Sequence, residues 1–168
     1  HCNDIAKDHP DWLVEQLSRW QKEGVDTRLL RHALRGLIKA GHRGALAIFA
    51  IQTDFKVQLI ALSCPAQVAI GDIFSFNYEL ITQQTGLVWI DYVLILHNKH
   101  GKTRRKVYKG IKRQAIQHSY LMATGQISFK PVTVRVYYAG LAKLILLLNG
   151  QEIANVDFHL TDSLHTDR

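Results

Sequence analysis

The 168-residue sequence has few cysteines and no long apolar run. Its two cysteines, Cys2 and Cys64, lie far apart, so the sequence predicts neither a disulfide framework nor a zinc site and fits a reducing cytoplasm best. The longest apolar stretches, at 45–51 and 144–148, fall far short of the ~18 residues that a membrane span needs. The chain begins at His1 without the charged and then apolar order of a signal peptide, and we expect it to be a piece of a longer polypeptide.

Complete catalytic signatures are also missing. The sequence contains no G-x-S-x-G, P-loop or H-E-x-x-H pattern. His97 and His100 lie near an expected strand end without a further His or Cys to complete a ligand set, which argues against a metal site. Cys64 has no obvious base beside it, which favours an inert thiol. From the residues alone we expect no metal site.

Asp91 interrupts an otherwise apolar run. A buried carboxylate at this position is either a proton carrier or, more commonly, the partner of a cation or a backbone donor on the next strand. The cationic stretch RRKVYK (104–109) is close at hand for the second role.

Positive charge, by contrast, is abundant. The chain carries 21 lysines and arginines against 14 acidic residues, a formal net charge of +7. The stretch HNKHGKTRRKVYKG (97–110) has no acidic residue and concentrates the cations Lys99, Lys102, Arg104, Arg105, Lys106 and Lys109. A basic domain lowers the free energy of meeting a polyanion before any specific contact forms. Composition alone leaves open nucleic acid, an anionic membrane surface and simple solubility.

Residues 10–50 have the apolar spacing of helices. The first expected helix begins at Pro10, a residue favoured at the first helical position, and stops at Gly24. Another is expected to begin within 42–51. Two antiparallel helices joined by a short turn, with a further one beginning, are typical of an α-solenoid unit. One such unit cannot bury its own faces, so we expect that earlier repeats are missing.

The second expected helix enters at Asp26 or Thr27 and closes at Gly41. At about 100° per residue, its apolar arc consists of Leu29, Leu30, Ala33, Leu34, Leu37 and Ile38. The opposite arc is a ridge of Arg28, Arg31, His32, Arg35 and Lys39. A solvated face explains most such ridges, but acids at i,i+4 are absent after Asp26, which weakens that explanation.

After residue 52 the period changes to that of strands. Turn residues separate short runs rich in β-branched and aromatic side chains, at 55–63, 72–81, 88–98, 104–110, 115–122, 132–138, 141–149 and 152–160. Seven or eight strands at this spacing predict an immunoglobulin-like sandwich, in which Trp89 packs between the sheets without a flanking cysteine pair. The run 132–138 is either a strand or an irregular crossover that ends at Gly140.

A hairpin with Gly101 in its turn is expected within 97–110. Its tip then gathers Lys99, His100, Lys102, Arg104 and Arg105, while Lys106, Tyr108 and Lys112 share one face of the returning strand. Such cations can guard an edge strand against aggregation, but phosphate binding is the favoured role. Membrane binding is disfavoured because the amphipathic helix that usually accompanies such cations is absent.

Several of these stretches resemble the AlkC-type bacterial DNA alkylation repair glycosylases. HCNDIAKDHPDWLVEQLSRW (1–20) and RHALRGLIKAGHRGALAIFAI (31–51) resemble their final helical repeats. IDYVLILHNKHGKTRRKVYKG (90–110) and LLLNGQ (146–151) resemble their carboxy-terminal immunoglobulin-like domain. The likeness covers residues 1 to about 160.

The resemblance implies a HEAT-like solenoid that wraps DNA along a concave cationic face and cleaves the N-glycosidic bond of alkylated bases without a metal or organic cofactor. Cationic bases are good leaving groups, so a carboxylate near the deoxyribose and aromatic contacts to the lesion can suffice. No residue of this sequence matches those catalytic groups. We therefore expect a monomer that binds duplex DNA but does not excise bases by itself.

The expected fold class is α+β in several parts: a short HEAT-like α-helical segment (1–52), an all-β immunoglobulin-like sandwich (53–162) and a disordered tail (163–168). The predicted DNA-binding residues are Arg28, Arg31, Arg35, Lys39, Lys99, His100, Lys102, Arg104, Arg105, Lys106 and Lys109. Ala139 and Ala142 stand where relatives tend to have Pro and His, which loosens any inference about contacts near Gly140. The alternative function is a non-catalytic immunoglobulin-like protein-interaction module whose cations serve solubility.

Overall fold

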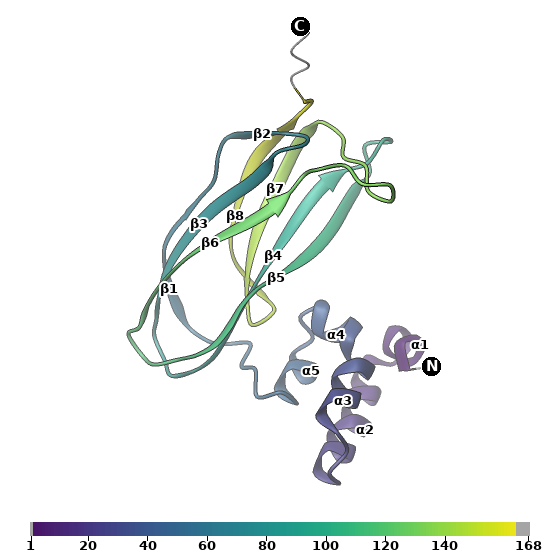
Figure 1. Cartoon of the computed structure of the whole chain (residues 1–168). Helices are drawn as coiled ribbons and strands as arrows, with labels where there is room; N and C mark the ends of the chain where they lie inside the picture. The colour runs from purple at the N-terminus through teal and green to yellow at the C-terminus, as the bar shows by residue number, and fades with distance from the viewer. Residues whose placement is uncertain (1, 164–168) are drawn as a thin grey trace, which may run out of the picture.

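The computed structural model describes residues 2–163. Its helices are α1 (Cys2–Asp8), α2 (Pro10–Lys22), α3 (Thr27–Ala33), α4 (Arg35–Lys39) and α5 (Arg43–Ala47). Its strands are β1 (Val57–Ser63), β2 (Gln67–Ala69), β3 (Ile73–Thr82), β4 (Gly86–His97), β5 (Thr103–Ala115), β6 (Tyr120–Ser128), β7 (Gly140–Leu148) and β8 (Gln151–Thr161). The helices gather at one end of a two-layered sandwich (Figure 1). No helix within residues 2–163 is long and apolar enough to cross a membrane.

Local sequence accounts for the first helices. Pro10 occupies the first turn of α2, where a missing N–H costs nothing. Leu13 and Leu17 of α2 are buried in a small apolar core shared with α1, α3 and α4. The Asp26 side chain begins α3 by accepting a hydrogen bond from the backbone N–H of Arg28 at 2.7 Å. The predicted helix starts at Pro10 and Asp26 are therefore confirmed.

The second expected helix is present with one break. Leu34, with φ −94° and ψ 5°, separates α3 from α4, and Gly41 turns the chain away with φ +72°. The expected burial of Leu29 is wrong, because its side chain is 65% exposed. Trp12 and Trp20 of α2 are also about half exposed, so the helical core rests on leucines rather than on the large aromatic residues.

The strands form two sheets, in the orders β1-β3-β6 and β2-β8-β7-β4-β5. Neighbours pair antiparallel except β2, which the sequence did not predict and which pairs parallel with β8. Aromatic rings fill the space between the sheets. Phe74 stacks on Phe158 with 4.2 Å between ring centroids, and Phe76 meets Tyr92 edge-on at 4.8 Å. The expected all-β sandwich is therefore present.

Two sequence expectations within this sandwich have a definite outcome. Val88 and Ile90 of β4 are fully buried between the sheets, so strand alternation turns Trp89 to the outer face, where it is partly exposed. The expectation that Trp89 packs between the sheets is therefore wrong. The run 132–138 is the irregular crossover, with one isolated bridge between Val132 and Arg135. The tail expected at 163–168 lies, apart from its first residue, outside the described residues.

A bulge in β5 overturns the expected common face of Lys106, Tyr108 and Lys112. Between the positions that pair with Trp89 and with Asp91, the register of β5 shifts by one residue. Tyr108 packs toward the core, whereas Lys112 lies on the outer face against the Trp89 ring. The bulge thus places Lys112 on the outer face with Trp89, opposite to the face of Tyr108.

The turn between β7 and β8 fixes the helices to the sandwich. Asn149, fully buried with φ +48°, donates a side-chain hydrogen bond to the Gln52 carbonyl at 2.7 Å and accepts one from the backbone N–H of Trp89 at 2.8 Å. Beside it, Gly41 lies so close to Gly150 that a Cβ on Gly41 would stand 2.3 Å from the Gly150 carbonyl oxygen. This contact sets the position of α4 relative to the five-stranded sheet.

Candidate nucleic-acid interface

A groove of about 500 Å³ separates α3 and α4 from the outer face of β4 and β5. One wall comes from the cationic ridge of the helices and the other from the two strands. The lining residues are Arg28, Arg31, His32, Arg35, Ile38, Lys39, Trp89, Asp91, Val107 and Lys109. Predicted cations from two distant parts of the sequence therefore face each other across one concave space.

The helical wall of this groove holds cations with few acidic partners. Arg28 is paired with Asp26 at 3.0 Å, which offsets part of its charge. In the part of the chain that the structure describes, Arg31, Arg35 and Lys39 form no ion pair with an acidic side chain. These three side chains are exposed and remain available to an anionic ligand.

Lys112 extends the strand wall of the groove. Its ammonium lies over the Trp89 ring, 4.8 Å from the centroid. Burial, followed by the positive charges of Arg31 and Lys109, lowers the pKa of Lys112. Because one of these neighbours belongs to α3 and the other to β5, cations from both walls act on the same ammonium. The positive charges around the groove thus repel one another in the free protein.

A second hollow continues the positive charge along β5. It is lined by Gly36, Lys39, Ala40, Arg105, Lys106 and Val107. Burial, followed by the charges of Arg135 and Arg104, lowers the pKa of Lys106, which lines this hollow. We call the groove, this hollow and the side chains of Arg104, Lys112 and Arg135 together the cationic surface.

The tip of the β4–β5 hairpin has the expected turn but lies outside the two hollows. The Asn98 side chain accepts hydrogen bonds from the backbone N–H groups of His100 and Lys102 at 2.9 and 3.0 Å, and Gly101 has φ +73°. Lys99, His100 and Lys102 are exposed and line neither the groove nor the hollow. The structure therefore does not bring these three predicted residues together with the others.

Asp91 contributes one carboxylate to the groove. Its Oδ1 accepts a hydrogen bond from the backbone N–H of Gly110 at 3.3 Å. Burial raises the pKa of Asp91, and this hydrogen bond and the charge of Lys109 oppose the rise. Of the two expected partners, a cation or a backbone donor on the next strand, the backbone donor is confirmed. Within residues 2–163, no group of three or more His, Cys, Asp or Glu is arranged to hold a metal ion.

The sequence did not place Trp89, Lys112 and Arg135 in the site. One signal was available: between Asp91 and Glu152 the sequence contains no acidic residue at all. This stretch includes β5, with Lys112, and the crossover that carries Arg135. Counting charge over the whole stretch, rather than over the hairpin, extends the candidate site to these two cations.

Comparisons with known proteins agree with the sandwich architecture. Residues 58–162 match the family model described as "Uncharacterised protein YhaZ, C-terminal Ig-like domain". The uncharacterized protein YhaZ of Bacillus subtilis (strain 168) is 29% identical over 162 residues, which are 95% of this chain and 45% of that protein. The predicted immunoglobulin-like sandwich is thus confirmed.

Two solved structures resemble this chain to different degrees. The alkylpurine DNA glycosylase AlkC of Pseudomonas fluorescens, bound to DNA containing an abasic site analog, superposes with a TM-score of 0.85 and 27% identity over 95% of this chain and 46% of that one. A β-glucosidase of Listeria innocua shares the fold alone, with a TM-score of 0.54 and 10% identity over 64% of this chain and 16% of that one. The predicted resemblance to the AlkC-type proteins is confirmed. The chain spans about half the length of YhaZ and of AlkC.

Proposed function

The chain belongs to the family of YhaZ C-terminal immunoglobulin-like domains, and we propose that it is the DNA-binding part of a DNA alkylation repair glycosylase. The cationic surface holds the phosphates of duplex DNA on both sides of an N-alkylated base. Helices α2 to α5 are then the last HEAT-like repeats of a solenoid, and the sandwich closes on the DNA beyond them. The AlkC structure supports this proposal, because that glycosylase is seen bound to DNA.

The observation that supports the proposal most strongly is the convergence of two cation sets on one groove. Arg31 and Arg35 come from the helices and Lys109 comes from β5, yet all three line the same space. Like charges held together raise the free energy of the free protein, and bound phosphates relieve that repulsion. Solubility requires surface charge but does not require charges to face one another across a concave space.

We do not expect the residues that the structure describes to excise a base. Asp91 is the acidic residue of the groove lining, and it is already hydrogen-bonded by Gly110 beside the charge of Lys109. The AlkC-type resemblance implies that the catalytic carboxylate and aromatic groups lie on preceding helices. We therefore expect the 168-residue chain to bind duplex DNA without releasing an alkylated base.

The salt dependence of DNA binding tests this proposal. When Arg31→Gln and Arg35→Gln are combined, the slope of log K against log salt should become shallower by about 1.8, because two phosphate contacts are lost. The matched control combines Lys22→Gln and Lys56→Gln, which remove the same charge outside the cationic surface and should leave the slope unchanged. Fluorescence anisotropy of a labelled duplex, titrated at several salt concentrations, measures both slopes.

Two outcomes would contradict the proposal. One is a DNA affinity that does not depend on salt, since phosphate contacts always release counterions. The other is equal loss of slope in the control pair, which would mean that net charge rather than the groove attracts the DNA. Stable capture of a protein partner in high salt, with no DNA binding, would favour the protein-interaction alternative.

A further inference from the structure

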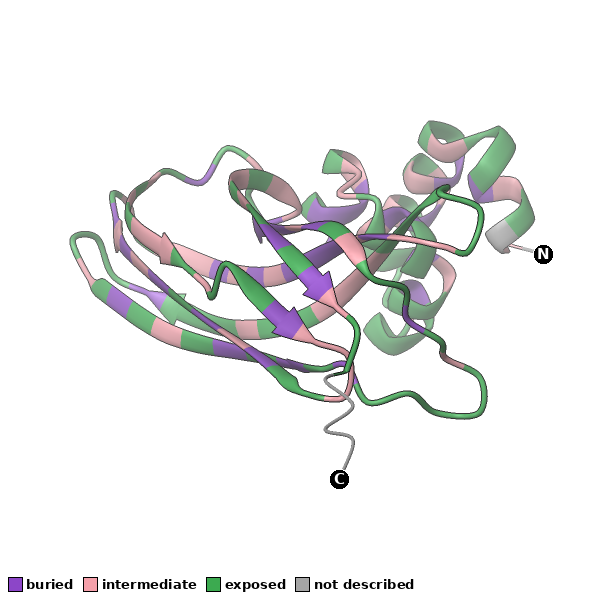
Figure 2. Ribbon diagram, turned by 90° about the horizontal axis from the view of Figure 1, so that it is seen from above, coloured by how far each residue is buried: buried purple, intermediate pink, exposed green. Residues whose placement is uncertain are grey.

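The crossover between β6 and β7 projects an apolar tip from a cationic part of the molecule. Val134 is 91% exposed, and the valines two residues to either side, Val132 and Val136, are each more than half exposed. The crossover leaves the sandwich beside the β4–β5 hairpin and is exposed over most of its length (Figures 1 and 2). A group of exposed apolar side chains on a loop is typical of a binding contact.

The tip is held in a defined shape. The backbone groups of Val132 and Arg135 exchange hydrogen bonds at 3.1 and 2.8 Å, which close a tight turn around Val134. Tyr137 anchors the base of the turn, because it is buried and meets the Phe129 ring edge-on at 5.1 Å. A pre-shaped loop loses little conformational entropy when it enters a partner.

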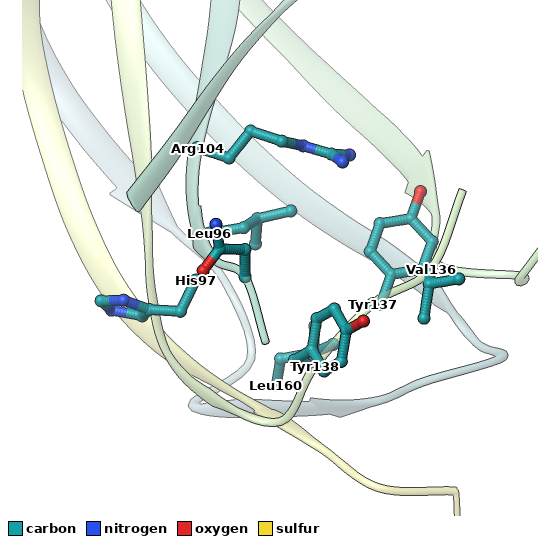
Figure 3. Close-up of a pocket in the computed structure, with 8 residues that line it drawn as sticks. Leu96, His97, Arg104, Val136, Tyr137, Tyr138 and Leu160 are labelled. Carbon is teal, nitrogen blue, oxygen red and sulfur yellow. The ribbon is translucent and has the colours of Figure 1, made fainter. Parts of the chain in front are cut away.

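The crossover also rests on the β4–β5 hairpin. Val136, Tyr137 and Tyr138 line, together with Leu96 of the hairpin, a water-sized cavity of about 30 Å³ (Figure 3). Arg104, on the returning strand, lines the same cavity, so the loop is supported from the side on which the cations of β5 begin.

Charge around the tip indicates what kind of partner it meets. Arg135 lies near Lys106 and Arg104, and Lys130 opens the crossover. No acidic residue occurs in the sequence between Asp91 and Glu152. The partner must therefore be anionic at its surface and apolar within, as stacked bases are behind their phosphates. A membrane surface has the same general chemistry, but the cationic surface continues from Arg104 along β5 into a concave groove, where a flat bilayer does not reach.

We propose that Val134 is a wedge that enters the base stack of duplex DNA where the stack is already interrupted, as at an abasic or unpaired position. Prying apart an intact base step costs free energy, and the cost is least where a base is missing or unpaired. A valine side chain offers no hydrogen bond, so the wedge senses the gap rather than the identity of the base. This inference rests on the proposed function, because the cationic surface must first align the DNA with the loop.

The test compares two duplexes, one intact and one with a single abasic site beside a 2-aminopurine reporter. The 168-residue chain should prefer the interrupted duplex by about tenfold and should raise the 2-aminopurine fluorescence. Val134→Ser should abolish both the preference and the fluorescence rise while leaving the affinity for the intact duplex and its salt slope unchanged. Val134→Leu, which keeps an apolar side chain, should retain both effects. Arg135→Gln is the charge control and should weaken binding to both duplexes equally.

Retention of the preference by Val134→Ser would overturn the wedge while the groove proposal stands. Absence of salt-dependent binding to either duplex by the parent chain would overturn both. A third arm uses vesicles that contain phosphatidylserine. If Val134→Ser lowers vesicle binding and leaves both DNA signals intact, the tip is a membrane contact and the DNA wedge is rejected. Circular dichroism checks that each variant is folded, which is expected for a change at an exposed loop position.

Discussion

Strands β5 and β6 are both edge strands of the same sandwich, but they differ completely in charge. β5 carries six cations in 13 residues: Arg104, Arg105, Lys106, Lys109, Lys112 and Arg113. β6 carries no charged side chain in nine residues. Both strands contribute side chains to the same core between the sheets, so packing does not account for the difference.

This difference separates two explanations for the cations of β5. If they guarded an open edge against aggregation, the other edges of the sandwich should carry similar charges. β1 and β2 are the remaining edges, and neither VQLIALS nor QVA contains a charged residue. The cations occur instead on the edge that α4 and the β6–β7 crossover approach, which favours a role in binding an anion.

Removal of positive charge from β5 should have the largest effect on DNA affinity. Lys106→Gln combined with Lys109→Gln should lower DNA affinity by about fiftyfold at ~0.1 M salt, because two phosphate contacts are lost. Thr124→Glu combined with Gln126→Glu makes the same change in net charge on the exposed face of β6 and should change affinity little. Anisotropy titrations compare the two pairs. Similar losses from both pairs would mean that overall charge, rather than the position of β5, controls binding.

Two aromatic residues, one near β5 and one on β6, should differ less strongly in their effect on DNA affinity. Trp89 lines the groove and lies under the Lys112 ammonium, whereas Tyr120 lies exposed on β6. Trp89→Ala should weaken DNA binding by about fivefold, since Lys112 loses its cation–π contact and one wall of the groove loses its aromatic surface. Tyr120→Ala should leave the affinity unchanged. Affinity is measured by anisotropy, with thermal melts to exclude unfolding, and unchanged binding by a folded Trp89→Ala would remove Trp89 from the site.

Local patterns were enough to predict most of the elements. The ridge of Arg31, Arg35 and Lys39 follows from the 3.6-residue period of a helix, and the hairpin turn at Gly101 follows from its residue types. The face of Trp89 was predicted wrongly, because a buried tryptophan on the third strand is typical of other immunoglobulin-like sandwiches. Alternation with the flanking apolar residues permits either face, and only packing decides between them.

The convergence of the two cation sets could not be predicted from the residues alone. It depends on the close contact of Gly41 with Gly150 and on the hydrogen bonds of Asn149 to the connector and to β4. These contacts join segments at least 60 residues apart in the sequence, and no local pattern specifies such a pairing. The bulge in β5 also cannot be read from a local pattern, and its one extra residue decides on which face of the strand Lys112 lies.

Removing the charge of Asp91 should have the smallest effect on DNA affinity. Asp91 is the acidic residue among the cations that line the groove. Burial holds its pKa above the ordinary value of 3.8, so the folded state binds a proton more readily than the unfolded chain does. The free energy of unfolding therefore falls as pH rises from about 3.8 through the raised pKa. Asp91→Asn keeps an oxygen for the Gly110 N–H and removes this loss.

The variant should melt about 1 to 2 °C above the parent at pH 7, and the gain should vanish as pH falls well below 3.8, where the parent carboxyl is protonated in both states. The same change should raise DNA affinity about twofold at low salt, because a carboxylate no longer faces the phosphates. Glu79→Gln on β3, in the three-stranded sheet, is the matched control and should leave DNA affinity unchanged. A weaker affinity for Asp91→Asn would show instead that the carboxylate positions Lys109 for its phosphate contact.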